Sequence, residues 1–166
     1  MCVIISGWLK ILVIKLRNVY IKDEWMGITY NMIIEYKTYG HDDDVQEISS
    51  GDVLRYCDLK NISLDGGEFD NTFLSCAIEF CDLYWVLFNN CLFVDVRFCD
   101  CKFSGVSFIS CRFINCDFVN CEFTQDNFNQ LCSFTETIWF GCKVEHSNGL
   151  PDGILSSLCQ SALHRG

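Results

Sequence analysis

The stretch CRFINCDFVNCEF, residues 111–123, sets the pattern of this chain: a cysteine and, two residues later, a phenylalanine recur at every fifth position. An apolar residue continues the phenylalanine position in both directions without a break. These apolar positions are Phe73, Ile78, Leu83, Phe88, Phe93, Phe98, Phe103, Phe108, Phe113, Phe118, Phe123 and Phe128. The position two residues earlier is mostly cysteine or valine, and its cysteines are Cys76, Cys81, Cys91, Cys101, Cys111, Cys116 and Cys121. The chain is therefore a repeat protein with a five-residue unit.

A five-residue period excludes both regular elements as long segments. An α-helix repeats every 3.6 residues and a strand every 2, so neither holds these side chains on one face for long. The backbone must turn once in each repeat, with the large residue and the smaller one both pointing inward. Short extended pieces joined by tight turns stack through strand-type hydrogen bonds. The sequence therefore predicts a solenoid.

The repeat resembles that of the pentapeptide-repeat family, whose loose consensus is a small residue, Asp or Asn, then Leu or Phe, followed by two free positions. Cys81-Asp-Leu83, Cys116-Asp-Phe118 and Cys121-Glu-Phe123 fit this consensus, and the resemblance covers residues 57–144. It implies an all-β fold, a right-handed quadrilateral β-helix with four repeats in each coil.

The repeat changes phase at two places. Phe69 and Phe73 are four residues apart, which predicts a tightened corner, and one extra residue between Phe128 and Phe134 predicts a small bulge. No residue is inserted between Phe73 and Phe128, so we expect a rod without the projecting loops that many members of the family carry.

Four segments are expected along the chain. Residues 57–145 form the β-helix, residues 32–56 a leading strand and an acidic loop, and residues 146–166 a cap. The cap is needed because an open solenoid end exposes core and strand edges. After Pro151, apolar residues follow helical spacing, which predicts a capping helix over residues 151–163. The resemblance implies that this C-terminal segment is also the contact of a homodimer.

Residues 1–31 are atypical, being apolar and net basic. They are either an extension upstream of a natural start at Met26 or Met32, or a strand or helix packed on the first coil. Lys10, Lys15 and Arg17 interrupt the apolar run, so neither a membrane span nor a signal peptide is expected. We expect a cytoplasmic protein.

Thirteen cysteines are an odd number, and their spacing directs most of them to one interior. We interpret them as reduced, small apolar core residues. Zinc sites need converging ligand pairs, whereas these cysteines lie five apart on successive faces. No nucleophile, phosphate-binding or metal motif is present, so we expect no metal, no cofactor and no enzymatic activity.

Function is therefore expected on the outer surface. The net charge of −10 disfavours direct binding of nucleic acid. Members of the resembled family protect DNA gyrase or topoisomerase as DNA-shaped decoys, which implies a DNA-binding enzyme, such as a type II topoisomerase, as partner. The acidic residues predicted to bind it are Asp82, Asp95, Asp100, Asp117 and Glu122. Alternatively, these charges alternate with basic residues along the rod and only support stacking.

A second hypothesis is an immunity or adaptor scaffold that binds a protein through an exposed apolar patch. Its residues are Tyr84, Trp85 and Leu87, near an outward stack of Leu74, Val94 and Ile114. Contiguous exposed apolar surface often marks an interface. Alternatively, these side chains only favour strand structure or are covered by the N-terminal segment. Salt separates the two functions, because a DNA mimic loses its partner steeply as salt is added.

Overall fold

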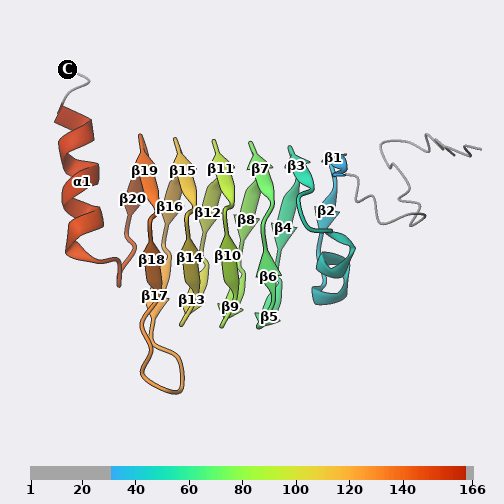
Figure 1. Ribbon diagram of the computed structural model, residues 1–166, viewed down its shortest axis with the longest axis horizontal. Coiled ribbons are helices and arrows are strands. Elements are labelled where there is room, and N and C mark those ends of the chain that lie inside the picture. Colours follow the sequence, from blue (N-terminus) through green and yellow to red (C-terminus); the bar gives the residue numbers. More distant parts are fainter. Residues whose placement is uncertain (1–30, 164–166) are drawn as a thin grey trace, which may run out of the picture.

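The computed structural model describes residues 31–163 as four parallel sheets stacked around one core (Figure 1). The first face holds β1 (Ile33–Glu35), β3 (Val53–Arg55), β7 (Thr72–Leu74), β11 (Leu92–Val94), β15 (Arg112–Ile114) and β19 (Ile138–Phe140). The second face holds β2 (Thr38–Tyr39), β4 (Asp58–Lys60), β8 (Ala77–Glu79), β12 (Arg97–Cys99), β16 (Asp117–Val119) and β20 (Lys143–Glu145). The third face holds β5 (Ser63–Asp65), β9 (Asp82–Tyr84), β13 (Lys102–Ser104) and β17 (Glu122–Thr124). The fourth face holds β6 (Glu68–Phe69), β10 (Leu87–Asn89), β14 (Ser107–Ile109) and β18 (Ser133–Thr135).

Each strand pairs in parallel with the strand one coil away. Phe93, for example, lies opposite Phe73 in one neighbouring strand and Phe113 in the other. One coil therefore takes twenty residues, four repeats of five, and the predicted quadrilateral β-helix is confirmed. The hypotheses on residues 1–30, including a start at Met26, concern residues outside this description.

The core is a set of stacked aromatic rings. The predicted inward residues from Phe73 to Phe123 are all buried, and those in one face stack nearly parallel. The ring centroids of Phe93 and Phe113 are 4.8 Å apart, and those of Phe98 and Phe118 are 4.6 Å apart. Such pairs add about 0.5–1.5 kcal/mol each beyond the burial of their area.

The inward cysteines fill space in the core, and their thiols also donate weak hydrogen bonds to backbone carbonyls. The Sγ of Cys111 lies 3.2 Å from the carbonyl oxygen of Phe88, and that of Cys116 lies 3.4 Å from that of Phe93. A thiol is a weak donor, so each of these cysteines adds a weak hydrogen bond to a carbonyl of the preceding coil, which an alanine would not form. The eleven cysteines from Cys57 to Cys142 are free thiols.

The corner after each strand requires a left-handed residue. Asn, Asp and Gly tolerate this conformation best, and they occupy most corners, as Asn115 and Asn120 do with φ near 54°. Bulky aromatic side chains occupy four corners instead, at Tyr36, Tyr56, Phe80 and Trp85.

The predicted one-residue bulge is wrong. Phe88 pairs with Phe108, 20 residues later, whereas Phe108 pairs with Phe134, 26 residues later, so six residues are inserted. They form a loop that projects between β17 and β18, contrary to the expectation of a rod without loops (Figure 1). Phe128 lies in this loop and is 69% exposed, so its assignment to the core is also wrong. The physical reason is Asp126, which stands where a small apolar residue is needed and binds backbone N–H groups instead.

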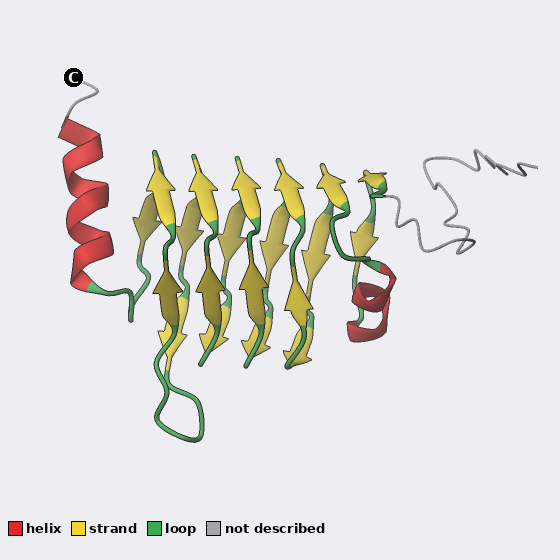
Figure 2. Ribbon diagram, in the orientation of Figure 1, coloured by secondary structure: helices red, strands yellow, loops and turns green. Residues whose placement is uncertain are grey.

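The two ends carry the helical elements (Figure 2). Residues 32–39 form two strands, β1 and β2, joined by a corner at Tyr36, rather than one leading strand, and the acidic segment forms the 3₁₀ helix η1 (Asp42–Glu47) rather than a loop. At the other end α1 (Asp152–Leu163) packs against β19, with Leu150 and Leu158 buried, which confirms the predicted C-terminal helix.

Candidate functional site

Charge is distributed unequally over the four faces. The strands of the first and second faces carry five acidic and five basic residues, whereas those of the third and fourth faces carry four acidic residues and one basic residue, Lys102. The negative potential of the strands is therefore concentrated on one side of the solenoid. A uniformly acidic cylinder does not describe it.

The acidic residues singled out from the sequence do not form one cluster. Asp82, Lys102 and Glu122 lie in register on the third face, and Asp117 lies opposite Arg97 on the second face. Asp95 and Asp100 occupy corners on either side of the second face. There Asn115 and Asn120 of the next coil donate amide hydrogen bonds to them, at 3.3 and 3.2 Å. These two carboxylates therefore also serve the stacking of coils.

Trp85 is the unusual residue of the corner between the third and fourth faces. The same corner is glycine one coil earlier, at Gly66, and one coil later, at Gly105, because the backbone has positive φ there. Trp85 adopts φ 57° although a left-handed conformation costs a residue with a Cβ roughly 1–2 kcal/mol. Strain of this kind, once observed, supports a hypothesis of function.

The projecting loop holds the Trp85 ring in place. Its indole N–H donates a hydrogen bond to the Asp126 carboxylate, and the ring stacks on Phe128 with centroids 5.4 Å apart. The Trp85 ring also stacks on Tyr84 at 5.8 Å, and the Tyr84 hydroxyl accepts a hydrogen bond from the backbone N–H of Asn127 at 3.4 Å. Three rings therefore form one stack that joins the loop to β9.

Asp126 organises the loop from within. Its carboxylate also accepts the backbone N–H of Phe128 at 2.7 Å and that of Gln130 at 2.8 Å. Partial desolvation raises the pKa of this carboxyl, but the hydrogen bonds from Trp85 and the two backbone groups outweigh it, and the pKa is lowered.

Gly105 leaves room for this arrangement. A Cβ at Gly105 would lie 2.7 Å from the Cβ of Asp126 and 3.1 Å from Cδ1 of Trp85. The absent side chain lets the indole cross one coil and reach the loop.

We call Tyr84, Trp85, Phe128 and Leu131 the apolar platform. Trp85 is 49% exposed and Leu131 63% exposed, although the rings are fixed by their contacts. An adjoining pocket of about 450 Å³ is lined by Trp85, Gly105, Ser107, Asp126, Phe128, Gln130, Leu131 and Ser133. The predicted residue Leu87 is half-buried and pairs with Ser107 on the fourth face. The sequence analysis did not predict Phe128 and Leu131 as surface residues of a binding site, and it placed Phe128 in the core. The one signal in the sequence was the acidic residue at position 126.

Residues 31–163 contain no group of three or more His, Cys, Asp or Glu side chains that could hold a metal ion. Within the same residues, no helix is long and apolar enough to cross a membrane.

Four stacked parallel sheets with one left-handed corner per repeat define a parallel β-solenoid. The family model of pentapeptide repeats matches residues 81–120 in eight copies. The match covers the central coils, and strands with the same five-residue spacing continue on both sides of that segment.

No curated protein matches the chain in sequence. Solved structures that resemble it include two trypsin-treated forms of QnrB1, a plasmid-mediated fluoroquinolone resistance protein, at 10% and 12% identity with TM-scores of 0.32 and 0.33. The aligned regions cover 68% and 69% of this chain, and 53% and 67% of those chains, so the match spans about half the length of the first.

Proposed function

We propose that the protein is a non-enzymatic, protein-binding solenoid whose partner docks on the apolar platform. The observation that carries this proposal is Trp85, whose backbone is strained and whose half-exposed ring is held in one position by one hydrogen bond and two stacking contacts. Rigid aromatic side chains are effective anchors, because binding removes little conformational freedom from them.

The platform lies at the corner between the third and fourth faces, whose strands together carry four acidic residues and one basic residue. A partner with an apolar anchor flanked by lysine or arginine residues complements both properties. The charges then guide association, and the buried rings slow dissociation.

The experiment uses the fact that glycine fits the Trp85 corner. Trp85→Gly removes the anchor and relieves the backbone strain, so we expect a folded protein that no longer binds. Phe80→Asn is the matched control, since Phe80 is another exposed aromatic corner residue with φ 55°, and asparagine occupies the same corner one coil earlier, at Asn61. Proteins captured from the host are quantified by mass spectrometry with wild type and both variants. We expect at least one protein that wild type and Phe80→Asn both capture and that Trp85→Gly does not. The proposal fails if there is no such protein.

A second candidate function is DNA mimicry, in which the acidic side enters the cationic groove of a DNA-binding enzyme such as a type II topoisomerase. This function is supported by the charge of the third and fourth faces, whose strands carry four acidic residues and only one basic residue. Asp82→Lys with Glu122→Lys reverses the charge of the third face. As a mimic, this variant would lose its partner by orders of magnitude at low salt. As a platform binder, it would retain most of its affinity.

A homodimer formed through α1 remains a prediction. Sedimentation of the wild type and of a chain truncated before Pro151 would test it.

A further inference from the structure

The outer side of the first face is a second surface, and it is mainly apolar. Leu74, Val94 and Ile114 lie in register in one row, and Leu92, Arg112 and Ile138 lie in register in the row beside it. The helices of the described residues lie at the two ends of the solenoid (Figure 2). Parallel sheets normally have both sides covered, usually by helices.

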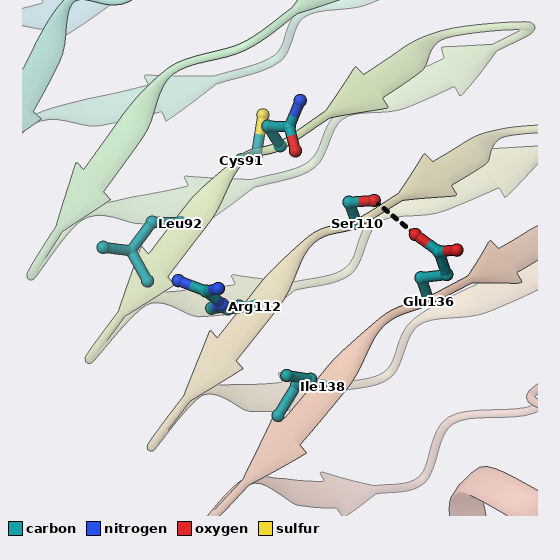
Figure 3. A pocket seen from close by; sticks show the side chains of 7 residues that line it. Cys91, Leu92, Ser110, Arg112, Glu136 and Ile138 are labelled. Atoms are coloured by element: carbon teal, nitrogen blue, oxygen red, sulfur yellow. Dashed lines mark hydrogen bonds between the residues drawn. The ribbon is translucent and has the colours of Figure 1, made fainter.

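Two basic side chains stand on this surface: Arg55, which forms an ion pair with Glu35 of the neighbouring strand, and Arg112. Arg112 lies between Leu92 and Ile138 (Figure 3), at a pocket of about 460 Å³ whose other lining residues include Ser110 and Glu136. The Ser110 hydroxyl donates a hydrogen bond to Glu136 at 2.9 Å. Among residues 31–163, Arg112 forms no ion pair within 4 Å, so its guanidinium can accept an acidic partner.

We propose that the first face docks an amphipathic α-helix of a partner protein, lying along the solenoid axis. Its apolar stripe covers Leu74, Val94 and Ile114, and one Asp or Glu side chain pairs with Arg112. The charge of Arg112 favours a helix that has one acidic residue on the side facing the solenoid and apolar residues at the other positions of that side. A guanidinium–carboxylate pair is directional, so it also fixes the register of the helix.

The dimensions of the face fit one helix. Six strands spaced about 4.8 Å apart span roughly 24 Å, the length of about 16 helical residues. Three-residue strands are about 10 Å long, close to the diameter of a helix. One helical turn advances about 5.4 Å, so residues three or four apart meet successive strands.

The same dimensions argue against a second copy of this chain as the occupant. The face measures roughly 240 Å² in plan, whereas a stable interface buries about 800 Å² on each partner. A second copy would need contacts beyond this face to reach that area, whereas one helix matches the face in length and width. This surface is separate from the apolar platform, so either proposal can fail without the other.

A photo-crosslinking amino acid at position 94, in the native host, tests the proposal. Position 119 is the control, because Val119 occupies the corresponding outward place on the second face and is also half-buried. We expect position 94 to crosslink to one segment of one protein, with apolar residues at i, i+3, i+4 and i+7 and an acid among them. Equal yields at both positions, crosslinks to a second copy or to residues 1–30, or a segment without this spacing would overturn it.

A charge swap then tests Arg112 itself. A peptide of the crosslinked segment should bind Arg112→Gln at least tenfold more weakly than wild type, as measured by fluorescence anisotropy. Arg112→Glu should bind weakly too, and replacing the acid of the peptide by arginine should restore its binding. Unchanged affinity for both variants would overturn the role of Arg112. Circular dichroism confirms that both variants fold, and unchanged binding of the peptide to Trp85→Gly separates this surface from the platform.

Discussion

The indole N–H of Trp85 donates a hydrogen bond to the carboxylate of Asp126, 41 residues further along the chain and two coils further along the solenoid. The bond crosses above Gly105. Through this bond the six inserted residues pack against Trp85 and form part of the apolar platform.

Gly105→Ala should break this arrangement. The added Cβ collides with Asp126 and the backbone stays left-handed, so we expect the loop to separate from Trp85 and the melting temperature to fall. Gly66→Ala is the control, since Gly66 occupies the same corner with nothing within 4 Å of a Cβ. It should carry only the backbone cost, about 1–2 kcal/mol. Equal losses in the two variants would mean that the loop contact contributes nothing.

Acid should release the loop only at low pH. The pKa of Asp126 is lowered on folding, so its contribution to stability is complete above its ordinary value of 3.8 and is lost as pH falls through the lower value of the folded state. The indole N–H resonance of Trp85 should therefore shift below pH 3.8 and stay constant above it. The Asp126→Asn variant should lack this transition, and a midpoint above 3.8 in the wild type contradicts the assignment.

Phe103→Ala should destabilise the protein by about 3–5 kcal/mol, because Phe103 is fully buried and stacks on Phe123 at 4.7 Å. Phe128→Ala should have little effect on chemical denaturation, because that ring is mostly exposed. The same residue type at two positions of one five-residue period thus gives opposite results. Similar losses at both positions would restore Phe128 to the core.

Thiol reagents should distinguish inward from outward cysteines. Among the cysteines from Cys57 to Cys142, Cys111, Cys116 and Cys121 are fully buried and should react only on unfolding, whereas Cys99 is half-buried on an outer face. The hydrogen bond to Asp100 raises the pKa of Cys99, so its labelling should accelerate above pH 9. Labelling of the native protein followed by peptide mapping provides the readout, and early modification of Cys116 would contradict the fold register.

The sequence predicted the coils well and the loop poorly, for one physical reason. In a coil, local spacing decides which side chains face inward, so Phe73 to Phe123 could be placed from periodicity alone. Phe128 keeps the same spacing, and only Asp126 indicates that the chain has left the coil. The contact between Trp85 and the loop depends on distant parts of the chain meeting, which no local period encodes.

The loop leaves the register of later strands intact. Ser107 pairs with Ser133 and Arg112 with Ile138, as they would if the six extra residues were absent. Each coil is aligned by the ladder of the coil before it, so a corner can accept additional chain without transmitting the change along the solenoid. The corner between the third and fourth faces is therefore a natural grafting point, where segments of other lengths and specificities can be displayed beside Trp85 on an unchanged framework.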